Sequence, residues 1–155
     1  MPTAHLICGY SGSGKTTFAR ELEADRGAVR FTPDEWLAQQ YGSEIPLDKT
    51  DQYRRQIVEM IWQDALLALS LGREVVLDFG FWKRAARDEA RARLAGYRTE
   101  FYLVVCDEDI AWARIAQRNQ TAVPFLQITP EAFARDKAAV ERLGEDEDFI
   151  LVHKG

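Results

Sequence analysis

The 155-residue chain lacks the features that mark several broad classes of protein. It contains no run of about 18 apolar residues, which is the length that a membrane-spanning helix needs. Its first residues show no basic segment followed by an apolar stretch, so we expect no signal peptide. From these absences we expect a cytoplasmic protein with no membrane partner.

The chain also has few cysteines and no excess of positive charge. Cys8 and Cys106 are the only cysteines, and they lack the spacing of metal-binding sites or disulfide frameworks. We expect both to be reduced residues in buried strands, with a metal or disulfide role as the weaker alternative. The formal net charge of −5 gives no general attraction to nucleic acid, although a local basic patch is compatible with it.

The chain does have enough apolar residues for a substantial core, at 46% of the sequence. Its length suits one domain and no repeat or linker divides it, so we expect a single domain over residues 1–155. Apolar runs and helical spacing predict strands at 4–9, 28–32, 74–79, 99–106 and 148–152, and helices at 15–25, 34–41, 51–71, 83–95, 108–119 and 130–142. This alternation predicts a parallel sheet with helices on both faces.

Residues 9–16 form an unbroken G-x-x-x-x-G-K-S/T phosphate-binding loop between the first expected strand and the first expected helix. The glycines let successive backbone N–H groups point at one anion, Lys15 reaches the β- and γ-phosphates, and the Thr16 hydroxyl ligates Mg²⁺. The helix start adds free N–H groups and a favourable dipole. The residues expected to bind ATP are Gly9, Ser11, Gly12, Ser13, Gly14, Lys15, Thr16 and Thr17, together with Arg118 from a later helix.

Asp78 ends the third expected strand, directly after an apolar run. Ligands of an open parallel sheet lie beyond the carboxyl ends of its strands, so Asp78 shares an edge with the phosphate loop if the two strands are neighbours. A carboxylate at that place can hold Mg²⁺ directly or through water. The alternative is an acid that caps the following turn.

Asp34 follows the second expected strand and stands at the start of a helix. A phosphoryl acceptor needs a carboxylate within hydrogen-bond reach to orient its hydroxyl and take its proton, and Asp34 is the candidate for this base. The alternative is a simple helix cap, because Asp is a favoured residue there. Glu35 is the next candidate if Asp34 is not the base.

Arg114 and Arg118 lie four residues apart, so they project from one face of the helix expected at 108–119. An irregular stretch follows and leads into the last helix. A helix, a connection and a second helix are the design of a lid, here over residues 114–137, which could bring an arginine to the transferring phosphoryl group. The alternative is a solvated arginine face. Weaker candidates on the second lid helix are Arg135 and Lys137.

Four stretches together resemble one known family. They are GYSGSGKT in the phosphate loop, FTPDEW at 31–36, VVLDFGFWKRAARDEARARL at 75–94 and ARIAQRN at 113–119. They look like the P-loop kinases of the AAA_33 type, which are similar to polynucleotide kinase and zeta-toxin kinase domains. The resemblance spans nearly the whole chain, and its most specific part is the combination of PDEW with LDFGFW and a following Arg-Asp pair, Arg87 and Asp88.

This resemblance implies a three-layer α/β P-loop NTPase fold, with a five-stranded parallel sheet of order 2-3-1-4-5 and a short helical lid. It implies that the strand of Asp78 lies directly beside the phosphate-loop strand. It also matches Asp34 to the acid on the acceptor side and Arg118 to the lid arginine.

The acceptor pocket should lie across the sheet edge from the phosphate loop. Aromatic side chains can stack on a base or a sugar ring, so Trp36 and Trp82 are candidate acceptor contacts. Arg87 could bind an acceptor phosphate or pair with Asp88 or Asp34. Further candidates are Tyr10, Tyr41, Phe79, Phe81, Lys83 and Arg84, with core packing an equally good explanation for the two phenylalanines.

Two functions fit these residues. The first is an ATP-dependent phosphotransferase that moves a γ-phosphate to a hydroxyl of a small molecule, a nucleotide or a nucleic-acid end. The second is an ATPase or switch that couples hydrolysis to a partner protein. Asp34 and the arginines of the lid favour the first, because a switch would more naturally carry a water-orienting Gln. We expect a monomer or homodimer with a small-molecule or nucleotide acceptor, and the acidic charge disfavours long nucleic acid.

Overall fold

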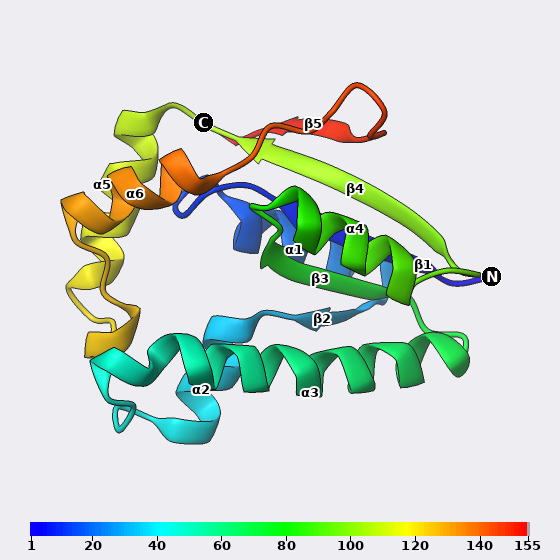
Figure 1. The fold of residues 1–155 in the computed structure, drawn as a ribbon, viewed down its shortest axis with the longest axis horizontal. Helices are drawn as coiled ribbons and strands as arrows, with labels where there is room; N and C mark the ends of the chain where they lie inside the picture. Colours follow the sequence, from blue (N-terminus) through cyan, green and yellow to red (C-terminus); the bar gives the residue numbers. More distant parts are fainter. Residues whose placement is uncertain (155) are drawn as a thin grey trace.

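The computed structural model of the chain describes residues 1–154 and has a five-stranded sheet at its centre (Figure 1). The strands are β1 (Thr3–Cys8), β2 (Val29–Phe31), β3 (Val75–Gly80), β4 (Arg98–Val105) and β5 (Ile150–His153). Their order is β2-β3-β1-β4-β5, and every neighbouring pair is parallel. The predicted sheet is thus confirmed, including β3 beside β1.

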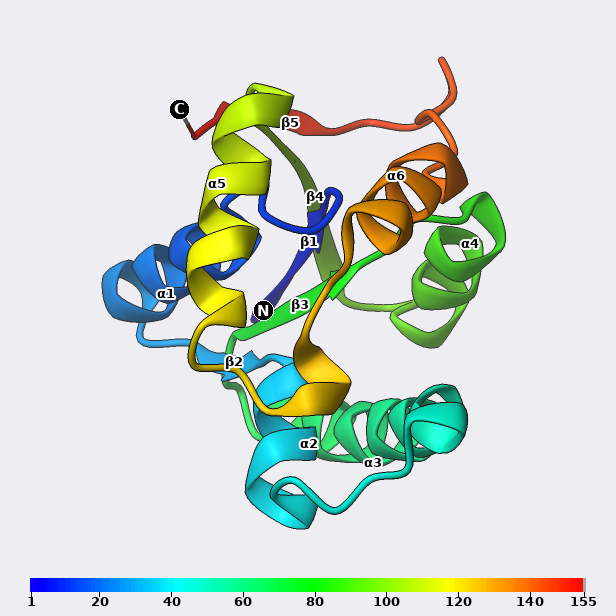
Figure 2. The same cartoon turned by 90° about the vertical axis from the view of Figure 1, so that its left-hand side faces the viewer.

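Helices cover both faces of the sheet, as Figure 2 shows from the end of the molecule. They are α1 (Lys15–Arg26), α2 (Pro33–Tyr41), α3 (Thr50–Ser70), α4 (Arg84–Arg93), α5 (Glu108–Asn119) and α6 (Pro130–Ala139), with short 3₁₀ turns η1 (Leu47–Lys49) and η2 (Pro124–Leu126). Helix α1 lies on one side of the sheet, and α3 and α4 lie on the other.

The alternation of side chains along the strands explains this layering. Leu6 and Leu77 are fully buried against the α3 and α4 side, whereas Ile7 and Val76 are fully buried against α1. Successive residues of a strand point to opposite faces, so a strand that is buried on both faces is mostly apolar. The apolar runs at 6–8 in β1 and 75–77 in β3 have this cause, whereas the buried His5 of β1 is hydrogen-bonded to Tyr102 and Glu74.

The elements follow the predicted ranges closely, and the differences have local causes. Helix α6 ends at Ala139 rather than at residue 142, because the backbone N–H of Glu141 donates to the carbonyl of Trp82 at 2.7 Å. The chain therefore leaves the helix to run past the end of β3. No helix within residues 1–154 is both long enough and apolar enough to cross a bilayer.

The two cysteines are both free thiols, as expected, but only one of them lies in a strand. Cys8 is buried at the end of β1, and burial raises the pKa of its thiol to about 12. It therefore stays protonated and unreactive near neutral pH. Cys106 lies just beyond β4 and is only half-buried, so its predicted place in a buried strand is wrong.

Candidate active site

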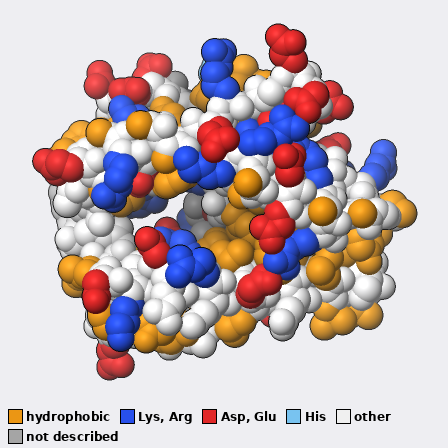
Figure 3. Space-filling model, in the orientation of Figure 1, with side chains coloured by type: hydrophobic (Ala, Val, Ile, Leu, Met, Phe, Trp, Pro, Cys, Tyr) orange, Lys and Arg blue, Asp and Glu red, His pale blue; other side chains and the backbone are white. Residues whose placement is uncertain are grey.

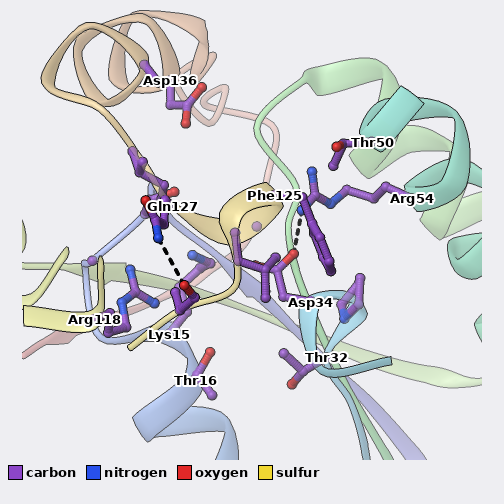
Figure 4. Close-up of a pocket in the computed structure, with 18 of the residues that line it drawn as sticks. Lys15, Thr16, Thr32, Asp34, Thr50, Arg54, Arg118, Phe125, Gln127 and Asp136 are labelled. Atoms are coloured by element: carbon purple, nitrogen blue, oxygen red, sulfur yellow. Dashed lines mark hydrogen bonds and ion pairs between the residues drawn. The ribbon is translucent and has the colours of Figure 1, made fainter. Parts of the chain in front are cut away.

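A cavity of about 660 Å³ lies against the edge of the sheet where β1, β2 and β3 end (Figure 4). The phosphate loop and the start of α2 form its floor. The first turns of α3 form one wall, and the α5–α6 segment forms the opposite wall. Parallel strands bring their carboxyl ends to the same edge, which is why residues far apart in sequence meet here.

The phosphate loop follows β1 and can close only because of its glycines. Gly12 has φ +79°, and a Cβ atom there would lie 2.5 Å from the carbonyl oxygen of Ala111 in α5. Gly14 has φ +102°, and its Cβ atom would lie 2.7 Å from Cβ of Lys154. Both positions combine a left-handed backbone with a close neighbour, so no other residue fits without strain. The glycine positions thereby leave a tight backbone cradle at the start of α1.

Lys15 lies at the first position of α1 and lines the cavity. Its Nζ donates to the carbonyl of Tyr10 at 3.2 Å, across the loop that it follows. Burial lowers the pKa of Lys15, whereas the nearby carboxylates of Asp78 and Asp34 raise it. A cation that is withdrawn from water and backed by two acids is well placed to bind phosphate oxygens. Thr17, by contrast, is exposed on the first turn of α1 and does not line the cavity.

Asp78 is buried, yet only one of its carboxylate oxygens has partners. Its Oδ2 accepts hydrogen bonds from the hydroxyls of Thr16 at 2.8 Å and Thr32 at 3.0 Å. Its Oδ1 has no hydrogen-bond partner among the described residues, and neither does the buried hydroxyl of Ser13. Burial raises the pKa of Asp78, and the charge of Lys15 opposes that rise. An unsatisfied buried oxygen is costly, so it calls for a ligand.

The oxygens of Thr16 and Asp78 fit Mg²⁺, which prefers oxygen ligands and usually keeps several of its own waters. The described residues contain no group of three or more His, Cys, Asp or Glu that could hold a metal ion by themselves. A P-loop site does not need such a group, because the phosphates of the nucleotide supply further ligands. The residues present therefore fit Mg²⁺ bound together with a nucleotide.

Asp34 lies in the first turn of α2, is exposed, and lines the same cavity. Its Oδ1 accepts a hydrogen bond of 2.6 Å from the guanidinium of Arg54 in α3 (Figure 4). Helix α2 begins after Thr32 and has no side-chain cap, so the helix-cap explanation for Asp34 is not what the structure shows. Glu35 pairs with Arg20 and Arg30 outside the cavity, so Asp34 is the one of these two neighbouring acids that faces it. Asp51 and Asp136 also line the cavity, from α3 and α6.

The arginines of the α5–α6 segment divide into two groups. Arg118 and Arg135 line the cavity, and Arg118 lies close to Lys15 (Figure 4). Arg114 instead donates to the carbonyl oxygens of Gly12 at 3.3 Å and Lys154 at 2.5 Å, so it supports the phosphate loop from outside. Lys137 forms an ion pair with Glu108 and does not line the cavity.

The connection between α5 and α6 is held more firmly than its irregular sequence suggests. The side-chain amide of Asn119 donates to the carbonyl of Ile128 at 2.8 Å and accepts from the N–H of the same residue at 3.0 Å. Phe125 of η2 is buried and packs into the main core. The loop thus forms a closed ring that reaches across the cavity to the α2–α3 side.

The predicted acceptor contact of Arg87 is wrong. Its side chain is fully buried and forms an ion pair of 2.8 Å with Glu147, which is also buried. Its other N–H groups donate to the carbonyls of Phe81 and Arg142. The guanidinium therefore has no free face for a ligand, and it ties α4 to the C-terminal loop.

The two predicted tryptophan contacts differ. Trp36 packs on Phe31 in the core and does not line the cavity, so the structure contradicts its predicted role. Trp82 does line the cavity, and its indole N–H donates to the carbonyl of Gly9 at 2.8 Å. Trp82 is therefore fixed against the phosphate loop and presents its ring rather than its N–H group.

Two contributions to the site were missed from the sequence. Thr32 follows β2, and because Phe31 pairs with Leu77, it lies opposite Asp78. The strand order together with the lengths of the apolar runs could have indicated this register. Arg54 is one of two adjacent arginines on its helix, and nothing in the local sequence distinguishes it from Arg55. Its role follows only from the approach of α3 to α2.

The fold and the site together define a class of protein. A phosphate loop between β1 and α1, an acid at the end of the adjacent strand and the sheet order 2-3-1-4-5 make this a kinase-like P-loop NTPase fold. The chain belongs to the AAA_33 family, described as an AAA domain, whose model matches residues 5–143. No curated protein matches the chain significantly.

Several solved structures have a similar fold. A sugar kinase from Janibacter sp. HTCC2649, solved without ligand, is 21% identical over 99% of this chain and 86% of its own, with a TM-score of 0.68. A gluconokinase from Sinorhizobium meliloti 1021 is 20% identical over 98% of this chain and 82% of its own, with a TM-score of 0.65. Kti12 from Chaetomium thermophilum in complex with ADP-AlF3 is 14% identical over 97% of this chain and 88% of its own, with a TM-score of 0.73. At such identities the likeness establishes the fold.

Proposed function

We propose that the protein is an ATP-dependent phosphotransferase that moves the γ-phosphate of Mg²⁺-ATP to a hydroxyl group of a small molecule or nucleotide. One observation carries this proposal: the phosphate loop and Asp34 face the same cavity. Its volume of about 660 Å³ lies within the usual range of small-molecule sites, about 300–1,000 Å³. The cavity therefore has room for an acceptor between the donor residues and a carboxylate.

The donor side would be formed by the phosphate loop. Its backbone N–H groups and Lys15 would bind the β- and γ-phosphates, as the loop does in other P-loop enzymes. Thr16 and Asp78 would hold Mg²⁺. When bound, that ion would neutralise the charge that develops on the phosphates during transfer.

The acceptor side would be formed by Asp34 and Arg54. Asp34 would accept a hydrogen bond from the acceptor hydroxyl and take its proton as the phosphoryl group arrives. The 2.6 Å contact with Arg54 would fix the orientation of this carboxylate. Arg54 is thus a positioning residue whose effect passes through Asp34.

The segment over residues 114–137 would act as the lid of the proposed single domain. Arg118 projects from it into the cavity, where its charge would stabilise the transferring phosphoryl group. The ring closed by Asn119 and Ile128 would move as one piece, because its two ends are hydrogen-bonded to each other. Closure would exclude water and so favour transfer to an alcohol over hydrolysis.

The acceptor class is proposed from size and charge. The net charge of −5 gives no attraction to long nucleic acid, so a nucleic-acid end fits less well than a small molecule. The sugar kinase and the gluconokinase have the same fold, and their names support a small-molecule acceptor. A monomer or homodimer would suffice, since the described residues of one chain supply both halves of the cavity.

The test is a transfer assay with ATP that carries a radioactive γ-phosphate, run against a panel of sugars, nucleosides, antibiotics and 5′-hydroxyl oligonucleotides. We expect label in at least one small-molecule alcohol. Lys15→Ala should abolish transfer and weaken ATP binding. Asp34→Ala should lower kcat by about 10²- to 10⁴-fold, the usual contribution of a general base, with ATP affinity unchanged.

Glu35→Gln is the matched control, because Glu35 is the neighbouring acid and lies outside the cavity. It should keep turnover close to that of the wild type. Unchanged turnover in Asp34→Ala would remove Asp34 as the base. Steady release of labelled phosphate with no labelled alcohol would reject the phosphotransferase and favour the ATPase.

A further inference from the structure

A second, smaller cavity lies between α3 and α4, with a volume of about 270 Å³. Its walls are mostly apolar and include Val58, Trp62, Phe79, Phe81, Trp82 and Ala86. We call this cavity the aromatic crevice. Nothing in the proposed transfer chemistry uses it, although it brings together two of the four tryptophans in the chain.

The aromatic crevice adjoins the cavity of about 660 Å³ at the sheet edge, which we call the transfer cavity, because Val58, Phe79 and Trp82 line both. Figure 3 shows the two on one face of the molecule. A hollow lies between the α5–α6 segment and the start of α3, and a strip of apolar side chains runs from it between α3 and α4, with charged side chains along the rim. A single molecule could therefore occupy both cavities at once.

The walls of the crevice are held rigidly in place. The rings of Phe79 and Phe81 stack with centroids 5.2 Å apart, and Trp62 meets Phe79 edge-on at 5.7 Å. Trp82 cannot swing away easily, because its indole N–H is bound to the carbonyl of Gly9. A preformed aromatic surface binds a ring with little loss of side-chain entropy.

The backbone at Phe81, in the wall of the crevice, is held in a strained conformation. Phe81 has φ +49°, a left-handed conformation that is uncommon for a bulky residue. The buried guanidinium of Arg87 donates to the carbonyl of Phe81 at 3.0 Å and so holds the turn in this form. Strain of this kind persists where the surroundings fix it, and it is frequent at binding sites.

We propose that the acceptor is amphipathic: its hydroxyl lies at Asp34 and an aromatic or similarly apolar ring lies in the aromatic crevice. This inference rests on the proposed phosphotransferase function and adds the chemical class of the acceptor to it. The contrast between the two cavities supports it. The transfer cavity has charged walls, including Asp34, Arg54 and Arg135, whereas most residues that line the crevice are apolar and only Lys83 and Glu89 are charged.

The test uses matched pairs of alcohols that differ only in a ring: methyl and phenyl glucoside, and glycerol and its phenyl ether. Dissociation constants are measured by calorimetry, so the readout does not require transfer. We expect the ring-bearing member of a pair to bind at least about tenfold more tightly, which is the effect of burying a few apolar carbons.

Ala86→Phe should abolish this preference, because the larger side chain would fill the crevice. Ala86 is exposed on α4 and lines the crevice but not the transfer cavity. Ala85→Phe is the matched control on the adjacent, exposed position outside both cavities, and it should keep the preference. Affinity for Mg²⁺-ATP should be unchanged in both variants, which checks their folding. Ala86→Leu repeats the test with a smaller side chain.

Two results would overturn the inference: no tighter binding of the ring-bearing member in either pair, or an equal loss of preference in Ala85→Phe and Ala86→Phe. Its failure is distinguishable from failure of the proposed function. A ring preference that depends on residue 86, without phosphorylation of any alcohol, supports the crevice and rejects the phosphotransferase. Phosphorylation of ring-free alcohols without a ring preference supports the phosphotransferase and rejects the role of the crevice.

Discussion

Asp78 and Glu147 are both carboxylates with 5% of their surface exposed, but their surroundings differ sharply. Glu147 accepts hydrogen bonds on both oxygens, from Arg87, Arg91 and the backbone N–H of Gly144. Asp78 accepts two hydroxyl hydrogen bonds on one oxygen and none from residues 1–154 on the other. The first site is complete within the protein, and the second is not.

The pKa values move in opposite directions for this reason. Burial raises the pKa of both groups, but the hydrogen bonds to Glu147 outweigh burial and lower its pKa to about 2. At Asp78, Lys15 and two hydroxyls do not offset burial, so its pKa is raised. A satisfied buried charge supports the fold, whereas an unsatisfied one is retained where a ligand completes it.

The largest expected effect is on stability at Glu147. Glu147→Gln should lower the free energy of unfolding by about 3–5 kcal/mol, because the buried guanidinium of Arg87 loses its counter-charge. Urea denaturation measures this change. Asp146→Asn is the control: its exposed carboxylate also pairs with Arg84, yet its loss should leave the midpoint nearly unchanged. Equal effects of the two variants would contradict a structural role specific to Glu147.

Asp78→Asn should impair catalysis rather than stability, the opposite of the effect expected for Glu147→Gln. It keeps the shape of the side chain but removes the charge proposed to help hold Mg²⁺, so kcat should fall by about 10²- to 10³-fold. Steady-state kinetics with the acceptor found in the transfer assay measures it. If Asp78→Asn kept most of its activity at saturating Mg²⁺, the proposed role of Asp78 in catalysis would be contradicted, and Asp78 would be as dispensable for catalysis as Glu147.

The smallest effect is in the pH dependence of stability. The pKa of Glu147 is about 2 in the folded protein, below its ordinary value of 4.5. Its contribution is therefore complete above about pH 4.5 and is lost as the pH falls toward 2. Asp78 has the opposite sign, because a raised pKa favours the folded state most at low pH.

Denaturation curves recorded across this acidic range should therefore show a shallower acid loss in Glu147→Gln than in the wild type. In Asp78→Asn the acid loss should be slightly steeper, because the opposing contribution is gone. Parallel curves for all three proteins would mean that neither carboxylate has the environment described here.

Much of the fold and part of the site could be predicted from the sequence, because those features are local. The phosphate loop, the apolar run that ends at Asp78 and the helical spacing of α3 each lie within one stretch of chain. The strand order came from the family resemblance, and the structure confirmed it.

The errors concern contacts between distant residues. Arg87 follows the end of β3 by seven residues, so the sequence predicts it in the acceptor pocket. Its partner Glu147 lies 60 residues further along the chain, in an acidic stretch with no regular pattern. Asp34 and Arg54 likewise meet only after α2 and α3 pack together. Composition and periodicity carry no information about such pairs.

The central claim is that Asp78 helps to bind a metal ion that enters the site with the nucleotide. The most direct test measures the free energy of unfolding of Asp78→Asn and of the wild type, with and without Mg²⁺-ATP. Without ligand, the variant should be at least as stable as the wild type, since it lacks the unsatisfied buried charge. At a ligand concentration of about 100 times the wild-type Kd, the wild type should gain about 2.7 kcal/mol and the variant distinctly less. With ATP and a chelator, the two should gain equally. An equal gain with Mg²⁺-ATP would contradict the account.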